Sequence, residues 1–335
     1  MIKKYVMYCL VSMLVVLLLF TGCSNGPEGP NGSEELEKTT VILDWTPNTN
    51  HTGLYVALKN GYYEEEGLDV EIVQPMEGSS TTLVAAGQGD FGVTYQEDVT
   101  YARTGKDPLP VIAIATIIQD NTSGFAWRKE ENIQTVKDFE GKVYGGWGSP
   151  SEEAILEAIM TSAGADYTKL RNVNIGADDF FAATDKDIDI VWIFEGWTGL
   201  EAELRGVELD YMPLKDLHED LNYYTPVLVT NTALRDSDPE KVRRFLKATE
   251  RGYRYAMDDP EAAAAILLEY APELDQDLVV ESQKFLAGEY KGEAPQWGLM
   301  EEEVWQNYAD FLQGYGLLEK ELDVENAYTN EFLPQ

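Results

Sequence analysis

Short apolar runs alternate with amphipathic stretches along most of the chain, and this alternation predicts an α/β fold. The run at 111–118 is apolar throughout, as in a strand covered on both faces, and 68–73 alternates as a half-buried strand does. Helices are expected at 51–60 and 79–87, where the periodic stretches end at glycines. These segments build strand–helix–strand units around a mostly parallel sheet. Further strands are expected at 41–45 and 90–95.

A second series of the same kind begins near Gly124. Its helix at 149–164 starts with Ser149 as the expected N-cap and Pro150 at the first helical position. A further helix is expected at 198–206, and strands at 142–147, 172–175, 187–194 and 207–213. The strand at 224–231 is interpreted as returning to the first series.

Two alternating series with a return crossing predict two α/β lobes with a ligand cleft between them. Lobe I is expected to comprise 39–123 and 225–335, and lobe II 124–224. In each lobe, helices should flank a mostly parallel sheet. Ligands of open α/β sheets bind beyond the carboxyl ends of the strands, so the residues at those ends become the candidate site.

The C-terminal part is predicted to be helical. Asp238-Pro239 and Asp259-Pro260 each combine an N-capping side chain with a proline suited to the first helical turn. Apolar residues then recur at helical spacing, which is typical of core packing rather than of a cofactor site. They are Val242, Phe245, Leu246, Tyr253, Met257, Val304, Tyr308, Phe311, Leu312 and Tyr315.

The N-terminus is interpreted as a targeting segment. Lys3 and Lys4 precede an apolar run, and small residues stand just before Cys23, which resembles a bacterial lipobox. We expect residues 1–22 to be a signal peptide, Cys23 to be lipidated, and 23–38 to be a flexible tether without a core. The alternative is an uncleaved membrane anchor. Both place the rest of the chain outside the cytoplasm, attached to the cell membrane.

Charge and composition exclude several classes of function. The formal net charge is −35, so a nucleic-acid-binding protein is not expected. The acidity is spread along the chain and is interpreted as solubility or as adaptation to a salty or alkaline medium. The chain has two histidines, His51 and His218, no HExxH spacing and no cysteine beyond Cys23, so no metal site is expected. No G-x-S-x-G motif is present, although composition alone leaves a Ser-His-Asp triad open.

The predicted strand ends carry aromatic rings, amides and carboxylates but almost no positive charge. Such groups suit a flat, neutral or weakly basic heteroaromatic ligand, because rings can stack on it and a carboxylate can accept from its amino group. Trp45 and Trp147 could instead be core rings. The turn at 145–149 could also hold an anion through its backbone N–H groups. The candidate ligand-binding residues are Trp45, Asn48, His51, Tyr95, Gly146, Trp147, Ser149, Glu195, Trp197 and Tyr224.

The segment LDWTPNTNHTGLYVALKNGYYEEEGLDVEI at 43–72 closely resembles the opening of the pyrimidine-precursor family. This family includes bacterial ABC-importer binding proteins for thiamine pyrimidine precursors and the eukaryotic pyrimidine synthases. The stretches 85–93 and 238–249, the Gly145-Gly146 turn and Glu195 within VWIFEGW match as well. The resemblance covers essentially all of 40–335, and its first motif is the most specific. It implies a two-lobe, type II periplasmic-binding-protein-like fold whose cleft closes on the ligand.

The resemblance also implies an enzyme alternative. In the synthases a lysine holds pyridoxal phosphate and a nearby histidine is consumed as a substrate. The corresponding positions here are Thr94 and Asp98, and the region matching the synthases' cysteine-rich iron segment, 223–227, contains no cysteine. We therefore expect no cofactor and no enzymatic activity.

Among the binding proteins, the resemblance is to lipoproteins that deliver N-formyl-4-amino-5-aminomethyl-2-methylpyrimidine. It implies that Glu195 contacts the aminopyrimidine edge, that Trp45, Trp147 or Tyr224 stacks on the ring, and that an ABC permease and ATPase are the partners. Riboflavin-binding relatives share the fold and a similar opening motif, so a flavin is the main alternative ligand. A pyrimidine-forming enzyme and an interaction lipoprotein without a transport role are further alternatives.

Overall fold

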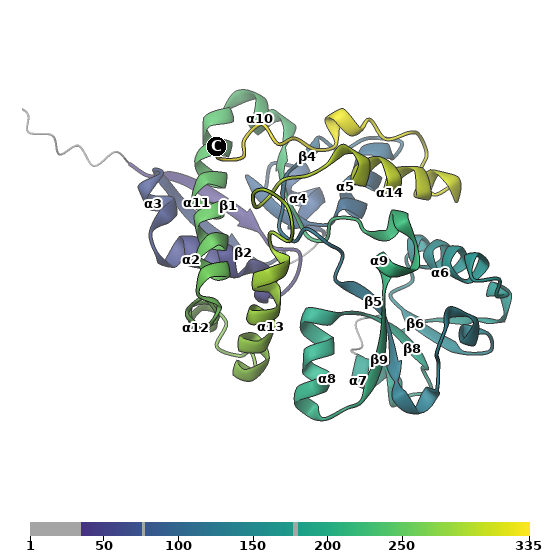
Figure 1. The fold of residues 1–335 in the computed structure, drawn as a ribbon. Helices are drawn as coiled ribbons and strands as arrows, with labels where there is room; N and C mark the ends of the chain where they lie inside the picture. The colour runs from purple at the N-terminus through teal and green to yellow at the C-terminus, as the bar shows by residue number, and fades with distance from the viewer. Residues whose placement is uncertain (1–34, 76–77, 177–179) are drawn as a thin grey trace, which may run out of the picture. The chain divides into compact units, whose positions relative to one another are not determined.

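Two five-stranded sheets carry the fold of Leu36–Gln335 (Figure 1). The computed structural model describes residues 35–75, 78–176 and 180–335. The expected signal peptide, the expected lipidation site Cys23 and most of the expected tether lie outside the described residues.

The first sheet has the strand order β2-β1-β3-β10-β4. Strands β1, β2, β3 and β4 run in one direction and β10 runs against its neighbours β3 and β4, so the sheet is mostly parallel. The return strand of the sequence analysis is β10, and it lies inside the sheet rather than at its edge. The bounds are β1 Glu37–Ile42, β2 Leu68–Val73, β3 Phe91–Thr94, β4 Val111–Thr116 and β10 Val227–Asn231.

The second sheet repeats this plan with the order β7-β6-β8-β5-β9. Here β5 is the strand that runs against its neighbours, β8 and β9. No strand was expected at the position of β5, although its side chains are almost all buried. The bounds are β5 Ser123–Arg128, β6 Val143–Gly146, β7 Arg171–Asn174, β8 Ile190–Phe194 and β9 Leu209–Pro213.

Helices flank both sheets (Figure 1). Along the first sheet the helices are α2 Thr52–Lys59, α3 Tyr62–Glu65, α4 Ser80–Ala85, α5 Gln96–Thr104, α10 Thr232–Ser237, α11 Pro239–Asp258, α12 Pro260–Tyr270, α13 Gln276–Glu289 and α14 Glu302–Gly314. Along the second they are α6 Pro150–Ser162, α7 Phe180–Thr184, α8 Leu200–Arg205 and α9 Leu214–Leu217. A π-helical turn, η5 Glu195–Gly199, precedes α8, and short 3-10 turns include η1 Thr49–His51.

The expected helix starts are confirmed by their caps. The Asp238 side chain accepts from the Lys241 backbone N–H and the Asp259 side chain from that of Ala262. Each aspartate precedes a proline at the first helical position. Both helix starts therefore follow from local sequence alone.

Strand β1 begins earlier than expected, within the range assigned to the tether. Glu37 and Lys38 pair in parallel with Leu68 and Asp69 of β2. Polar residues are tolerated there because this end of the strand is only partly buried. The strand ends at Ile42, so the expected range of 41–45 was placed too late.

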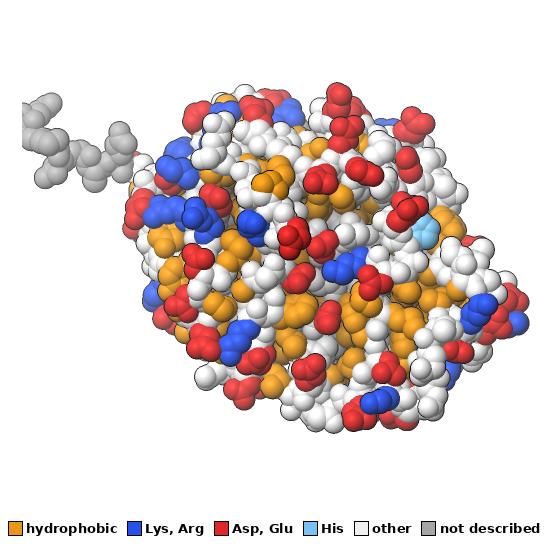
Figure 2. Space-filling model, in the orientation of Figure 1, with side chains coloured by type: hydrophobic (Ala, Val, Ile, Leu, Met, Phe, Trp, Pro, Cys, Tyr) orange, Lys and Arg blue, Asp and Glu red, His pale blue; other side chains and the backbone are white. Residues whose placement is uncertain are grey.

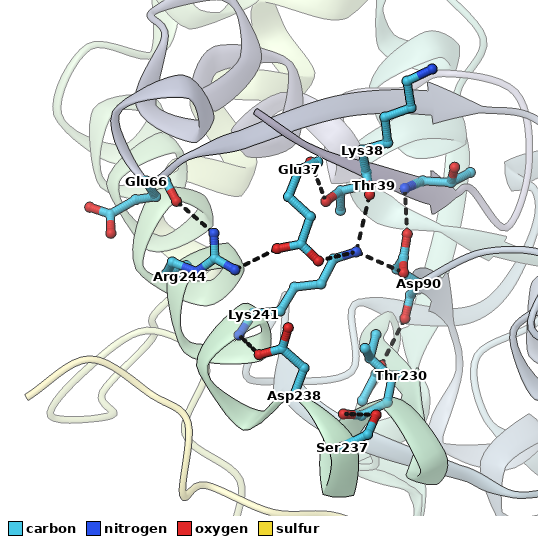
Figure 3. Close-up of polar contacts among 12 residues, drawn as sticks. Glu37, Lys38, Thr39, Glu66, Asp90, Thr230, Ser237, Asp238, Lys241 and Arg244 are labelled. Atoms are coloured by element: carbon cyan, nitrogen blue, oxygen red, sulfur yellow. Dashed lines mark hydrogen bonds and ion pairs between the residues drawn. The ribbon is translucent and has the colours of Figure 1, made fainter. Parts of the chain in front are cut away.

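A buried lysine fastens the start of α11 to the first sheet (Figure 3). The Lys241 Nζ lies 3.0 Å from Asp90 Oδ1, 3.2 Å from Glu37 Oε1 and 3.1 Å from the Lys38 carbonyl oxygen. Arg244, one turn further along α11, donates to Glu37 Oε2 at 2.6 Å. The lysine is only 4% exposed, so its charge depends on these partners.

Helices α2 and α11 approach so closely that their contact requires glycine. A Cβ on Gly252 would lie 1.9 Å from the Gly53 carbonyl oxygen, and a Cβ on Gly53 would lie 2.4 Å from the Tyr253 ring. Close helix contact brings α11 over the sheet, where Phe245 stacks on Phe91 with ring centroids 3.8 Å apart. Phe91 is the first residue of β3, so this stacking fixes the start of the strand whose other end leads into the candidate site.

Candidate functional site

Two adjoining cavities lie between residues of the first and second sheets. Their volumes are about 280 and 300 Å³, and both are lined by Tyr95, Trp192 and Phe194. Because they share these three residues, we call the pair the cleft. The first cavity is also lined by Glu97, Asp98, Ser123, Trp147, Tyr223 and Thr225. The second is also lined by Asp44, Trp45, Asn48, Thr49, Asn50, Thr122, Ile193, Gly196, Trp197, Thr198 and Leu286.

Aromatic rings form much of the cleft wall. Trp45 is 59% exposed and Trp147 48% exposed, which is unusual for indole side chains that could pack in a core. Trp147 lies against Trp192 with ring centroids 5.1 Å apart. Neither Trp45 nor Trp147 is a core ring, so both leave ring surface free for a flat ligand.

Three carboxylates line the same cleft, those of Asp44, Glu97 and Asp98. No lysine or arginine is among the described residues that line either cavity. Acidic side chains elsewhere are spread over the face that Figure 2 shows, with basic side chains among them. The cleft differs from that surface because its carboxylates have no cationic neighbour in the lining.

Asp44 is held by two donors, one on each carboxylate oxygen. Its Oδ1 lies 2.6 Å from His51 Nε2, and its Oδ2 accepts from the Tyr95 hydroxyl at 2.6 Å. The Asn48 backbone N–H donates to His51 Nδ1 at 3.2 Å, which leaves the Nε2 side of the ring to face Asp44. Burial alone would raise the Asp44 pKa, but the interactions with His51 and Tyr95 lower it below its ordinary value.

His51 itself is fully buried and is not among the residues that line the cleft. Both its ring nitrogens are used, one by Asn48 and one by Asp44. The structure therefore places His51 behind Asp44, where it orients that carboxylate. Asn48 does line the cleft, and its side chain caps η1 by accepting from the Asn50 N–H at 2.9 Å.

Glu97 connects elements that belong to different sheets. Its Oε1 accepts from the Ser151 hydroxyl of α6 at 2.9 Å, and its Oε2 from the Tyr308 hydroxyl of α14 at 2.5 Å. Burial raises the pKa of Glu97, and the nearby carboxylates of Asp98 and Glu152 add to the rise while the two hydroxyl donors oppose it.

Asp98 is the carboxylate with the fewest partners. Its Oδ2 accepts from the Thr94 hydroxyl at 3.1 Å, and its Oδ1 has no hydrogen bond to any described residue. Burial raises the pKa of Asp98, and the Asp44 carboxylate raises it further. Asp98 is thus a half-buried acceptor on the cleft wall with one oxygen available to a ligand.

The turn from Gly146 to Ser149 does not offer its N–H groups to an anion. The Glu152 side chain already accepts from the backbone N–H groups of Trp147, Gly148 and Ser149, at 2.7 to 3.2 Å. A Cβ on Gly146 would lie 2.1 Å from Glu152 Oε1, so glycine makes room for this carboxylate. The expectation that this turn could hold an anionic ligand is therefore wrong, because the Glu152 carboxylate already occupies its N–H groups. Ser149 is the N-cap of α6, as expected.

Glu195 and Tyr224 lie apart from the cleft wall. Glu195 lines a third cavity with Lys129, Glu203 and Tyr211, and burial raises its pKa. Tyr224 is 2% exposed, and its hydroxyl accepts from the Glu301 N–H, which places it in the packing beneath the cleft. Trp197, in contrast, lines the second cavity.

No group of three metal-ligating side chains occurs within 35–75, 78–176 and 180–335. Over the same residues, no helix combines the length and apolar character needed to span a membrane. These findings concern the described residues alone.

Residues 48–263 match the sequence profile of the NMT1/THI5-like family, which is more than half of the chain. The chain belongs to the NMT1/THI5-like family. Among the relatives of this chain, the formylaminopyrimidine-binding protein of Halalkalibacterium halodurans is 28% identical to it, over 96% of this chain and 98% of that protein. Riboflavin-binding protein RibY of Chloroflexus aurantiacus is 25% identical, over 96% of each chain. The 4-amino-5-hydroxymethyl-2-methylpyrimidine phosphate synthase of Legionella pneumophila is 25% identical, over 89% of this chain and 92% of that enzyme.

Solved structures confirm the expected fold of this NMT1/THI5-like chain. The periplasmic aliphatic sulphonate binding protein SsuA of Escherichia coli superposes with a TM-score of 0.69 at 15% identity, over 87% of this chain and 91% of that one. The two-lobe α/β fold of periplasmic binding proteins is therefore the fold of this family member.

Sequence reasoning about this NMT1/THI5-like chain missed several cleft residues. Trp192 and Phe194 belong to β8, where an apolar run gives no sign of which rings face a cavity. Asp98 follows a predicted strand, but its side chain faces the cleft because it belongs to the first turn of α5. Its spacing of four residues from Thr94, across the junction of strand and helix, is the sequence feature that could have identified it.

Proposed function

We propose that this chain is the extracytoplasmic solute-binding lipoprotein of an ABC importer, and that it captures a thiamine pyrimidine precursor such as N-formyl-4-amino-5-aminomethyl-2-methylpyrimidine. One observation carries the proposal. Exposed indole faces and carboxylates line one cleft that has no lysine or arginine in its wall. The family and the similarity to a formylaminopyrimidine-binding protein support the same ligand class.

The chemistry of an aminopyrimidine matches this wall. Its flat ring can stack on Trp147 or Trp45, and its amino group can donate to Asp98 Oδ1, which lacks another partner among the described residues. Anionic ligands such as sulfonates would meet Asp44, Glu97 and Asp98 without a compensating cation. The cleft therefore favours an amine-bearing ring over an anion.

Riboflavin is the second candidate ligand, favoured by the similarity to RibY. Each cavity has a volume of about 300 Å³ or less, near the lower limit for small-molecule sites. A single ring fits one cavity, whereas a fused three-ring flavin with its ribityl chain would have to occupy both. The volumes support the pyrimidine.

A pyrimidine-forming enzyme is a weaker candidate, although relatives named as synthases are similar over most of the chain. At the position that the resemblance assigns to the cofactor lysine stands Thr94, whose hydroxyl is hydrogen-bonded to Asp98 and Thr81. A threonine has no amine with which to bind pyridoxal phosphate. The residues present do not fit that cofactor, and we propose binding without covalent chemistry.

Ligand capture is proposed to shift the chain toward a closed arrangement. Residues of both sheets line the cleft, for example Asp98 after β3 and Trp147 after β6. A ligand that contacts both binds the closed arrangement better and increases its population. Lipidation at Cys23 and delivery to a permease complete the proposal and rest on the sequence pattern and the family.

Native mass spectrometry of the chain tests the proposal. The protein is unfolded and refolded to remove carried ligand, then offered the formyl-aminopyrimidine, 4-amino-5-hydroxymethyl-2-methylpyrimidine, thiamine and riboflavin in competition. Selective retention of a pyrimidine is expected. Retention of riboflavin alone would move the function to flavin uptake, and retention of none would refute the ligand class.

A pair of aromatic variants connects retention to the cleft. Trp147→Ala should weaken pyrimidine binding by about tenfold, since stacking on an exposed indole is worth roughly 1 kcal/mol or more. Tyr315→Ala removes a half-exposed ring directly after α14 that is not part of the cleft wall, and it should leave binding unchanged.

A further inference from the structure

Two threonine hydroxyls in the cleft wall have no partner. Thr122 lines the second cavity and Thr225 the first, and the two residues are 6% and 3% exposed. Neither hydroxyl forms a hydrogen bond with a described residue, and neither is among the buried polar atoms that lack a partner. Each oxygen is therefore open to the cavity that its residue lines, where a ligand can bind it.

Both threonines stand on the segments that join the two sheets. Thr122 directly precedes β5, and Thr225 lies two residues before β10. Hydrogen bonds tie these segments together, because the Asn121 backbone N–H donates to Asn222 Oδ1 at 2.8 Å and Asn222 Nδ2 donates to Asp120 Oδ1 at 2.7 Å. The two hydroxyls thus belong to one braced part of the cleft wall.

The backbone of Thr122 is fixed by the second sheet. Its carbonyl oxygen accepts from the Tyr211 hydroxyl of β9 at 2.8 Å and from the Glu195 backbone N–H at 3.0 Å. With its backbone held at this point, the side chain keeps its place in the wall before a ligand arrives. Such preorganisation reduces the free-energy cost of ordering a contact group on binding.

The second cavity suits a neutral amide. Its carboxylate, Asp44, already uses one oxygen for His51 and the other for Tyr95. Both polar atoms of the Asn48 side chain are likewise engaged within the chain. An ionised carboxylate can only accept, whereas the free Thr122 hydroxyl can donate. An N-formyl group presents a carbonyl oxygen that requires a donor, so this hydroxyl and the formyl group are complementary.

We propose that Thr122 determines specificity for the N-formyl arm of the ligand, the substituent on ring carbon 5. The pyrimidine ring occupies the first cavity, which contains Asp98 and Trp147, and the arm enters the second cavity, where the Thr122 hydroxyl donates to the formyl oxygen. The Thr225 hydroxyl remains for the ring. This inference rests on the proposed function and deepens it, because it assigns the two parts of the ligand to the two cavities.

Isothermal titration calorimetry with two ligands tests the inference. The formyl-aminopyrimidine carries the full arm, whereas 4-amino-5-hydroxymethyl-2-methylpyrimidine shares the ring and has a shorter arm without a carbonyl. Thr122→Val keeps the shape of the side chain and removes the hydroxyl. It should weaken the formyl compound by about three- to tenfold and the hydroxymethyl compound by no more than about twofold, as for one lost hydrogen bond. Poor folding of the variant would lower the binding stoichiometry and not the ratio of the two affinities.

Two further variants separate the hydroxyl from packing and the arm from the ring. Thr122→Ser retains the hydroxyl and should keep the affinity ratio of the unaltered chain, so a loss equal to that of Thr122→Val would overturn the inference. Thr225→Val removes the same group from the first cavity and should weaken both ligands by a similar factor. A selective loss of the formyl compound in Thr225→Val would contradict the division between the cavities.

The outcomes for the inference and for the proposed function differ. If both pyrimidines bind the unaltered chain and Thr122→Val weakens them equally or not at all, the inference is overturned while the proposed function stands. If the unaltered chain binds neither pyrimidine, the proposed function fails, and the inference fails with it.

Discussion

The Ser151 hydroxyl donates to the Glu97 carboxylate at 2.9 Å, which joins helix α6 of the second sheet to helix α5 of the first. Glu97 also lines the cleft. Any movement that separates the two sheets at this point must break the bond, so bond formation and access to the cleft depend on one another.

Removing the Ser151 hydroxyl should therefore favour the open arrangement. Ser151→Ala loses a hydrogen bond to a charged group, worth about 1 to 2 kcal/mol, and pyrimidine affinity should fall by roughly five- to thirtyfold. Calorimetric titration measures the affinity, and small-angle X-ray scattering measures the opening. Ser162→Ala, at the exposed end of the same helix, is the matched control. Unchanged affinity in Ser151→Ala would show that ligand binding and closure do not depend on this hydrogen bond.

Glu195→Gln is expected to change pyrimidine affinity by no more than about twofold, as for a partly exposed residue outside the ligand contacts. The reason is its position in the third cavity rather than on the cleft wall. The measurement is the same titration, with Asp98→Asn alongside. A tenfold loss in Glu195→Gln would mean that this carboxylate turns toward the ligand when it binds, as the family resemblance implies.

The raised pKa values of Glu97 and Asp98 predict a dependence of stability on pH. Both groups bind protons more tightly in the folded than in the unfolded chain, whose ordinary values are 4.5 and 3.8. Their favourable contribution is therefore complete below those ordinary values and is lost as pH rises through the raised pKa of each group. Urea unfolding across this window should show a smaller decline in Glu97→Gln than in the unaltered chain, with the exposed Glu130→Gln as control. An identical decline in both variants would contradict the assignment to Glu97.

Lys241→Met should destabilise the fold by about 1 to 3 kcal/mol, because it leaves Asp90 without its cation and leaves the partly exposed Glu37 with Arg244 alone. The midpoint of urea unfolding reports this loss. Lys106→Met removes the same charge from an exposed position after α5 and should have little effect. A Lys241→Met variant as stable as the control would show that packing, not charge pairing, holds α11 to the sheet.

Replacing a helix glycine by alanine should change stability in opposite directions at two positions, one at the contact of α2 with α11 and one in α13. Gly252→Ala should destabilise by about 1 to 3 kcal/mol or more, since its Cβ would collide with the Gly53 carbonyl. Gly288→Ala, in α13, meets no atom within 4 Å and should stabilise by up to about 1 kcal/mol through helix propensity. Thermal unfolding of the two variants distinguishes crowding from propensity, and a loss of stability in both would contradict this account.

Local sequence determined most of the fold but only part of the site. The caps at Asp238 and Asp259 and the apolar runs of β4 and β8 are properties of a few adjacent residues, and the structure agrees with them. Strand β5 was not predicted because Gly124 weakens the strand pattern of its sequence. Glycine is required there by a contact with a strand that is far away in sequence. A Cβ at this position would lie 2.2 Å from the Met212 carbonyl oxygen in β9.

Side-chain direction explains the remaining differences in the site. The polar turn after β1 predicted His51 as a ligand-binding residue, yet its ring lies behind Asp44 because Asn48 and Asp44 use both its nitrogens. The end of β8 predicted Glu195 as a ligand-binding residue, but the π-helical turn that begins there places its side chain in the third cavity. Such orientations depend on partners that are far away in sequence or on irregular backbone, and spacing alone does not reveal them.

The position of β10 has a consequence for how the chain reaches its native state. Strands β3 and β4 do not pair with each other, because β10, made more than a hundred residues later, lies between them. As the chain emerges from the ribosome, the first sheet keeps open edges until residue 231 is available, and the whole second sheet is synthesised in the meantime. High sequence separation slows folding. This topology thus delays completion of the first sheet until β10 has been synthesised.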